Sequence, residues 1–290
     1  MTVRALYELA APAKLNLFLH VVGRRPDGYH LLQSIFVLVD WADTLHVERR
    51  DDGALRRHDL GVTLPADDLC LRAARALQSA TGCTWGADIS IAKHIPSGAG
   101  MGGGSSDAAT TLLALNRLWG LNLPRARLLA LALTLGADVP FFIGGDNAFV
   151  EGIGERLTPI TLPPMWVAVV KPPSSLSTQA IFTHPSLVRS TGPAILSGSL
   201  VEDCAAGRFG HNDLQPPAED LCPEVGQAVR WLERRFGNAR MTGSGSAVFA
   251  RAGTGDSPVA TLPMHELAPG WVGRMCRSLP HHPLREWAED

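Results

Sequence analysis

Alternating apolar and polar residues predict a strand near the start of the chain. In the run AKLNLFLHVV, residues 13–22, every second side chain from Leu15 to Val21 is Leu or Val. Successive side chains of a strand point to opposite faces, so these apolar residues would face a core. The other face would carry Lys14, Asn16, Phe18 and His20. Lys14 and Asn16 are therefore expected to be neighbours.

Further along, strand-like and helix-like patterns are mixed. The runs at 34–39, 44–48, 87–92 and 165–170 are β-like, and 224–236 is helical. We expect one helix capped by Ser105 or Ser106 and running to about Trp119, and another from Pro124 to Gly136. The sequence therefore predicts an α+β protein. The Pro- and Gly-bearing region from about 152 to 164 is a candidate boundary, which divides the chain into domains 1–160 and 161–290.

The stretch PSGAGMGGGSSDAAT, residues 96–110, contains five glycines and two adjacent serines before an apolar helical run. Glycine is costly in a purely structural loop, because it loses much conformational freedom and packs no side chain. Unpaired backbone N–H groups at a helix N-terminus attract phosphate, because the donors are free and the helix dipole is positive there. The stretch is therefore predicted to bind a phosphate group.

Two common phosphate-binding motifs fit this loop poorly. Gly98 and Gly103 have the spacing of a Walker A loop, but Gly104 stands where that motif needs lysine. A dinucleotide fingerprint is nominally matched, yet no acidic residue lies between Asp107 and Asp138 to bind the ribose hydroxyls. Neither a P-loop nor a dinucleotide-binding fold is favoured.

Composition limits the classes of partner. The 290-residue chain has 46% hydrophobic residues and a formal net charge of −2, which gives no bulk attraction to nucleic acid or anionic membrane. The five cysteines are odd in number and lack a metal-binding spacing, so reduced thiols and a cytoplasmic location are expected. Neither a signal peptide nor a membrane-spanning run is predicted, since LLALALTLGA is too short to cross a bilayer. The oligomeric state is left open.

At this point the motifs carry a resemblance that runs nearly from end to end. PAKLNLFL, RPDGYHLLQSIF, PSGAGMGGGSSDAA, LGADVPFF, HNDL and MTGSGSAVF occur in the order found in the GHMP kinase family. Within the family, the chain resembles the kinases of the non-mevalonate isoprenoid pathway, whose substrate carries cytidine diphosphate. The resemblance implies a ribosomal-S5-like N-terminal domain, a ferredoxin-like C-terminal domain, and ATP and substrate in the cleft between them.

The resemblance also assigns roles to single residues. Lys14 and Asp138 match the catalytic pair, in which Asp138 accepts the proton of the attacking hydroxyl and Lys14 offsets negative charge. The ATP-phosphate loop would comprise Pro96, Ser97, Gly98, Ala99, Gly100, Met101, Gly102, Gly103, Gly104, Ser105 and Ser106. The substrate pocket would comprise Asn16, Tyr29, His30, Thr178 and Phe182. In that pocket two aromatic rings would hold a cytosine, and His30 would contact its polar edge. Mg²⁺ is expected, bound mainly through the ATP phosphates, and no dedicated metal ligands are assigned.

Each residue also has an ordinary structural interpretation. Asp138 could cap a short helix that starts at Val139, and Lys14 could lie on a solvated strand face. The turn at 241–247 could be a tight turn before a strand or a wall of the pocket. Asp68 stands where the family is expected to have an asparagine near the adenine, and a carboxylate only accepts hydrogen bonds when ionised. Residues 274–284 are given no role.

Three functions remain open on the sequence. The first is the kinase for the cytidine-diphosphate-linked substrate, the second another GHMP small-molecule kinase acting on homoserine or mevalonate, and the third a catalytically silent nucleotide-binding protein of the same fold. The YH turn favours the first over the second. The presence of both Lys14 and Asp138 argues against the third, because a binding protein needs no base.

Overall fold

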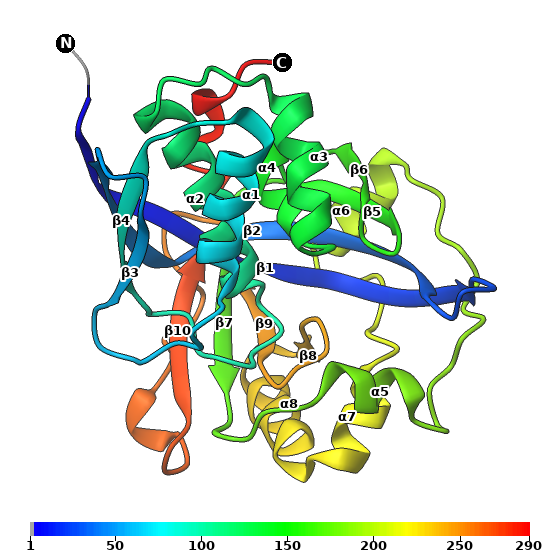
Figure 1. Ribbon diagram of the computed structural model, residues 1–290. Coiled ribbons are helices and arrows are strands. Elements are labelled where there is room, and N and C mark those ends of the chain that lie inside the picture. The colour runs from blue at the N-terminus through cyan, green and yellow to red at the C-terminus, as the bar shows by residue number, and fades with distance from the viewer. Residues whose placement is uncertain (1–2) are drawn as a thin grey trace.

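The N-terminal half is built on a six-stranded sheet. The computed structural model describes residues 3–290. The strands are β1 (Ala5–Arg24), β2 (His30–Arg50), β3 (Leu55–Asp59), β4 (Gly86–Ala92), β5 (Ala148–Gly152) and β6 (Arg156–Pro159). They lie in the order β3-β4-β2-β5-β6, and β1 pairs antiparallel with β2. Helices α1 (Leu69–Thr81), α2 (Gly103–Leu118), α3 (Arg125–Leu135) and α4 (Val139–Gly144) lie together above the long β1–β2 ribbon in Figure 1.

The C-terminal half forms a second, antiparallel sheet in the order β10-β7-β9-β8. Its strands are β7 (Trp166–Lys171), β8 (Arg240–Met241), β9 (Val248–Gly253) and β10 (Val272–Arg277). The helices are α5 (Thr178–Thr183), α6 (Gly198–Ala205), α7 (Gln215–Leu221) and α8 (Pro223–Phe236), with 3₁₀ turns at Met264–Glu266 and Arg285–Trp287. The mixed α+β content predicted from the sequence is confirmed.

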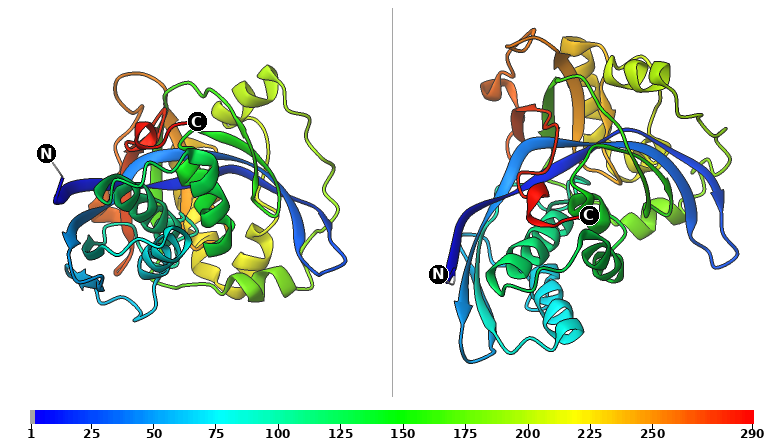
Figure 2. Two further views of the ribbon diagram at one scale, coloured as in Figure 1. Left: turned by 45° about the horizontal axis from the view of Figure 1, so that its top comes forward. Right: turned by 90° about the horizontal axis from the view of Figure 1, so that it is seen from above.

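Three apolar clusters hold these layers together. One packs the four N-terminal helices on their sheet, and another packs α7 and α8 on the C-terminal sheet. The third joins the two sheets, since it contains Leu15 and Val37 from β1 and β2 as well as Val169 and Phe249 from β7 and β9. Burial of this apolar surface is the main term that holds the two halves against each other, and Figure 2 shows both halves along the long ribbon. The division at residue 160 stays a prediction.

Strand β1 departs from the strict alternation that the sequence suggests. Its register with β2 shifts between Asn16 and Leu19. As a result Phe18, expected on the polar face, is fully buried in the same cluster as Leu15. Lys14 and Asn16 do lie on one face and contact each other, as predicted. Both are buried, however, because this face is turned toward the interior of the molecule.

The expected start of the helix after the glycine loop is wrong by one turn. Helix α2 begins at Gly103 and has Gly102 at its N-cap with a positive φ of 71°. The backbone N–H of Ser106 donates to the carbonyl of Gly102 at 2.9 Å, so Ser105 and Ser106 lie inside the helix. Left-handed backbone at Gly98, Gly100 and Gly102 turns the chain into the helix early, which a serine cap could not do as readily. The expected end is correct, because α2 ends at Leu118 with Trp119 as its C-cap.

The segment that follows β10 returns to the N-terminal half. Leu284 and Ala288 belong to the cluster beneath α1–α4. Arg125, at the start of α3, donates to the carbonyls of Ile143, Arg285 and Ala288 at 2.9, 3.0 and 2.7 Å. The chain after residue 280, to which the sequence assigns no role, is thus part of the N-terminal core.

Within residues 3–290, no helix has the length and apolar character needed to cross a membrane.

We predict that Arg125→Ala lowers the free energy of unfolding by about 3 kcal/mol, because the variant leaves several carbonyls without a charged donor. Chemical denaturation measures this difference. Arg127→Ala is the matched control, since Arg127 is exposed on the same helix. Equal stability of the two variants would contradict the role given to Arg125.

Candidate active site

A cleft of about 1120 Å³ gathers most of the residues singled out by the sequence. Its lining includes Lys14, Asn16, Tyr29, His30, Asp138, Thr178 and Phe182. From the glycine loop, Gly98, Gly100 and Gly102 line it as well. These residues come from β1, the β1–β2 turn, the start of β2, the loop before α2, the start of α4, and α5. The structure therefore brings the two predicted groups, phosphate loop and substrate pocket, into one cavity.

Lys14 and Asp138 form an ion pair at the cleft wall. Nζ of Lys14 lies 3.6 Å from Oδ2 of Asp138, and the lysine side chain is only 4% exposed whereas that of Asp138 is 33% exposed. Burial lowers the pKa of Lys14, and the charge of Asp138 opposes this shift. Asp138 does occupy the N-cap position of α4, but its side chain makes no capping hydrogen bond to any described residue. Its carboxylate is thus available both to Lys14 and to the cleft.

A chain of hydrogen bonds fixes the position of Lys14. Nζ of Lys14 donates to Oδ1 of Asn16 at 2.7 Å, and Nδ2 of Asn16 donates to Oγ of Ser34 at 3.0 Å. The backbone N–H of Asn16 donates to Oγ1 of Thr242 at 2.9 Å. Thr242 is fully buried and belongs to the second glycine turn, so the C-terminal half helps to orient a residue of β1. Asn16 therefore lines the cleft and also holds the side chain of Lys14 in position.

The glycine loop and the turn at 241–247 touch through their backbones. A Cβ atom on Gly100 would lie 2.3 Å from the carbonyl oxygen of Thr242, and one on Gly243 would lie 2.5 Å from the carbonyl oxygen of Gly100. The N–H groups of Ser246 and Ala247 donate to the carbonyls of Gly98 and Ala99 at 3.0 and 3.2 Å. These glycines are required by the close approach of the two segments. Gly243, Ser244 and Gly245 also line the cleft, so the turn forms one of its walls.

Only part of the predicted loop faces the cleft. Ala99 and Met101 are 3% and 1% exposed and pack in the cluster between the sheets, while the alternating glycines Gly98, Gly100 and Gly102 line the cavity. The loop thus alternates between buried side chains and bare backbone. It leads into the N-terminus of α2, where free N–H groups and the helix dipole favour an anion.

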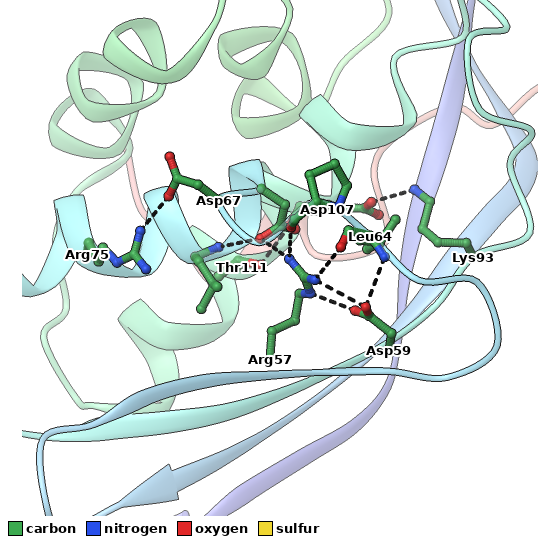
Figure 3. Close-up of polar contacts among 11 residues, drawn as sticks. Arg57, Asp59, Leu64, Asp67, Arg75, Lys93, Asp107 and Thr111 are labelled. Atoms are coloured by element: carbon green, nitrogen blue, oxygen red, sulfur yellow. Dashed lines mark hydrogen bonds and ion pairs between the residues drawn. The ribbon is translucent and has the colours of Figure 1, made fainter.

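A buried ion cluster anchors the segment that precedes the loop. Nζ of Lys93 contacts Oδ2 of Asp43 and lies 2.5 Å from Oδ2 of Asp107, as Figure 3 shows for Lys93 and Asp107. The other Asp43 oxygen accepts from the N–H groups of His94 and Ile95 at 2.6 and 2.8 Å. Burial, and to a lesser extent the charge of Asp43, raises the pKa of Asp107 to about 7, while Lys93 opposes the shift. No local sequence pattern indicates this cluster, because Lys93 is separated by 50 positions from Asp43 and by 14 from Asp107.

Asp68 has a structural role. It caps α1 by accepting from the N–H of Leu71 at 3.1 Å, and the same oxygen lies 2.9 Å from Nη1 of Arg57. Arg57 also pairs with Asp59 at 2.6 Å and donates to the carbonyls of Leu64 and Pro65 at 3.0 and 2.7 Å (Figure 3). The carboxylate that replaces the expected asparagine is therefore already engaged in holding the loop before α1.

The ring of Phe182, expected to face Tyr29 across a base, stacks on His30 instead. His30 stacks on Phe182, with ring centroids 5.0 Å apart and an interplanar angle of 27°, whereas Tyr29 is 61% exposed. Burial, followed by the charges of Arg189 and Arg24, lowers the pKa of His30. Thr178 lines the cleft beside the second glycine turn, since its Oγ1 lies 2.8 Å from Oγ of Ser244. The placement of a base between Tyr29 and Phe182 stays a prediction.

Sequence reasoning missed Arg24, Ser244 and Arg189, all of which line the cleft. Arg189 lies in a long segment without regular secondary structure between α5 and α6, where no periodicity marks a residue as inward-facing. Ser244 could have been found, because it lies in the glycine turn at 241–247, for which a pocket wall is one of the two interpretations given above. Arg189 contacts His30, which lies 159 positions earlier in the chain, whereas Arg24 donates to the carbonyl of Gly28 in its own turn at 3.1 Å.

Comparison with known proteins gives consistent results. Residues 68–146 match the family described as GHMP kinases N terminal domain, and residues 200–260 match GHMP kinases C terminal. A protein of Methylibium petroleiphilum named 4-diphosphocytidyl-2-C-methyl-D-erythritol kinase is 65% identical over 99% of this chain and 100% of its own length. One of the same name from Paracidovorax citrulli is 57% identical, with 99% of each chain covered.

Solved structures agree with these relatives. A crystal structure titled 4-(cytidine 5'-diphospho)-2C-methyl-D-erythritol kinase superimposes with a TM-score of 0.75 at 37% identity, covering 93% of this chain and 99% of the other. A homoserine kinase from Cytophaga hutchinsonii superimposes with a TM-score of 0.69 at 17% identity over 97% and 96%. The second likeness concerns the fold alone. The predicted two-domain fold is confirmed by these matches.

We predict that Asp107→Asn changes how stability depends on pH. In the folded protein Asp107 titrates at about 7, above its ordinary value of 3.8, so between these pH values the folded state holds a proton that the unfolded state has lost. This contribution to stability is complete below about pH 4 and is lost as pH rises through 7. The wild type should lose stability relative to the variant by up to about 1.4 kcal/mol per pH unit in that window.

Denaturant unfolding of both proteins at pH 5, 6 and 7 measures the difference. Asp203→Asn, at an exposed position that pairs with Arg208, serves as the control and should leave the pH dependence unchanged. Parallel pH curves for the wild type and Asp107→Asn would contradict the elevated pKa.

Proposed function

Because the chain belongs to the GHMP kinase family, we infer that it transfers a phosphoryl group from ATP to the 2-hydroxyl of 4-diphosphocytidyl-2-C-methyl-D-erythritol. It is a small-molecule kinase, and its reaction belongs to isoprenoid precursor biosynthesis by the non-mevalonate pathway. The observation that carries the assignment is the ion pair of Lys14 and Asp138 in the same cleft as a glycine loop at a helix N-terminus. The relatives supply the identity of the substrate.

We propose that Asp138 is the general base. In the reaction the substrate oxygen forms a bond to the γ-phosphorus of ATP, the bond between that phosphorus and the bridging oxygen of ADP breaks, and the hydroxyl proton passes to Asp138. The partly exposed carboxylate of Asp138 faces the cleft, which a proton acceptor requires. ADP leaves with the bridging oxygen.

We propose that Lys14 stabilises negative charge on the reacting groups. Asn16 and Phe36 hold its Nζ in place, by a hydrogen bond of 2.7 Å and by a ring centroid 4.4 Å away. A fixed cation in a water-poor site acts more strongly than one in bulk water, because it is poorly screened and needs no reorganisation during the reaction.

The binding assignments follow the same geometry. Gly98, Gly100 and Gly102 present backbone to the cleft, which supports residues 96–106 as the ATP-phosphate loop. Asn16, Tyr29, His30, Thr178 and Phe182 line the remainder and are assigned to the substrate. The separate domains 1–160 and 161–290 remain part of the proposal, with the segment after residue 280 packed back on the first.

ATP is the phosphoryl donor of this family, and we propose that Mg²⁺ arrives bound to its phosphates. Mg²⁺ prefers oxygen ligands and is usually held by substrate phosphates with one or two carboxylates. The cleft offers one carboxylate for this pattern, that of Asp138, whose side chain is 33% exposed, whereas the Asp27 carboxylate is paired with Arg25 at 2.6 Å. The ion would offset phosphate charge during transfer. A cytoplasmic location is also proposed, supported by the free thiols of Cys70, Cys83, Cys204, Cys222 and Cys276 in the described chain.

The deciding experiment compares three acceptors in an ADP-release assay with purified protein. We expect the protein to phosphorylate diphosphocytidyl-methylerythritol and to turn over homoserine and mevalonate far more slowly. Asp138→Asn should lower kcat by about 10²- to 10⁴-fold while ATP and substrate affinity stay nearly unchanged. Asp203→Asn, a substitution of the same kind on the surface, should behave as wild type.

Preferential use of homoserine or mevalonate would make the protein a different GHMP kinase. Absence of turnover with all three, together with normal ATP binding by calorimetry, would favour a silent nucleotide-binding protein. Wild-type kcat in Asp138→Asn would remove the base assignment.

A further inference from the structure

Arg189 joins the two stacked rings of the cleft through one guanidinium group. Its Nε donates to Nε2 of His30 at 3.2 Å. Its Nη2 donates to the carbonyls of Phe182 and His184 at 3.1 and 3.0 Å, and its Nη1 donates to the carbonyl of Leu187 at 3.0 Å. The same side chain therefore holds the segment that carries Phe182 and also contacts the imidazole stacked on that ring.

The contact between Arg189 and His30 defines where the imidazole carries its proton. An arginine N–H can only donate, and the guanidinium stays charged at any physiological pH. Nε2 of His30 must therefore offer its lone pair, which leaves the proton of the neutral ring on Nδ1. A doubly protonated ring would place two donors against each other. The lowered pKa of His30 is consistent with the neutral form.

A fixed Nδ1–H distinguishes between pyrimidine bases. At ring position N3, cytosine has a lone pair that accepts a hydrogen bond, whereas uracil has an N–H that donates one. A donor on His30 matches cytosine and opposes uracil, and a site that leaves buried donors facing each other rejects the wrong base strongly. Without Arg189, the imidazole could move its proton to Nε2 and accept from uracil.

We propose that Arg189 is a specificity-determining residue that fixes the His30 proton on Nδ1, so that the cleft selects bases with a lone pair at N3. The inference rests on the proposed function, in that the cytidine group must bind beside His30. Arg189 acts through His30 and is a positioning residue. Arg189 excludes the uridine compound because it prevents the His30 tautomer that carries its proton on Nε2. The remaining Nδ1–H then opposes the N3–H of uracil, and this repulsion contributes to specificity.

The test compares three substrates in the ADP-release assay: the cytidine compound, its uridine analogue and its 3-deazacytidine analogue, which has a C–H in place of N3. The wild type should prefer the cytidine compound by at least about 100-fold in kcat/KM over both analogues. In Arg189→Met the uridine-to-cytidine ratio should rise at least about tenfold, because the ring can now accept from uracil. In the same variant kcat/KM for the 3-deazacytidine compound should not rise relative to that for the cytidine compound, because the analogue has neither a lone pair nor an N–H at ring position 3.

Two further variants separate this role from simple support of the loop. Arg189→Lys keeps a charged donor and should keep the wild-type base ratio even if both efficiencies fall. Ser186→Ala disturbs the same segment by removing a hydrogen bond to Asp220 of 3.2 Å, and it should leave the ratio unchanged. If Arg189→Met lowered kcat/KM by the same factor for the cytidine and uridine compounds, Arg189 would only support the loop, and the proposal would fail.

The tautomer can be read without turnover. In ¹⁵N-histidine spectra of the full-length wild type at pH 7.5, His30 should show the pattern of a proton on Nδ1, and Arg189→Met should shift it toward Nε2. A wild-type ring protonated on Nε2 would overturn the proposal, even if the Met variant does not fold. Calorimetry with cytidine and uridine diphosphates tests the base ratio independently, so that an inactive protein would contradict the proposed function without deciding this inference.

Discussion

The site depends on one backbone contact, at which two glycine-containing turns from opposite halves of the chain meet with no room for a side chain. Gly100 and Gly243 lie so close that a Cβ on either would overlap the carbonyl oxygen of the facing segment. This contact places Thr242 under Asn16, and Asn16 in turn holds Lys14. Lys14, for which we propose a catalytic role, is therefore oriented by a contact between the halves, although both it and Asn16 belong to β1.

Lys14, which is buried, and Lys93, which is partly buried, flank the glycine loop and differ in what surrounds them. Lys93 lies between Asp43 and Asp107, and these two carboxylates raise its pKa despite its burial. Lys14 has one carboxylate, at 3.6 Å, and burial lowers its pKa. Lys93 is satisfied within the protein and serves to anchor the loop. The charge of Lys14 is less fully neutralised by the protein, and a phosphoryl group in the cleft would supply a second negative partner.

The sequence predicts those features that local patterns determine. Lys14 and Asn16 are neighbours because of strand geometry, and the end of α2 follows from Gly120. Alternation places Phe18 on the wrong face, because a register shift cannot be read from the sequence pattern. Ser105 and Ser106 were expected as caps because the preference for serine is local, whereas the early start of α2 is set by three left-handed glycines. The pairing of His30 with Arg189 spans 159 positions, and no spacing rule anticipates it.

The return of residues 281–290 to the first sheet also orders events during synthesis. The cluster beneath α1–α4 includes Leu284 and Ala288, and the donors of Arg125 reach carbonyls at 285 and 288. When the ribosome has made the first half, that half still lacks these partners and exposes the surface they will cover. The core of the first half is completed only after the whole second half has been synthesised. The nascent chain therefore cannot form the finished cleft before synthesis ends.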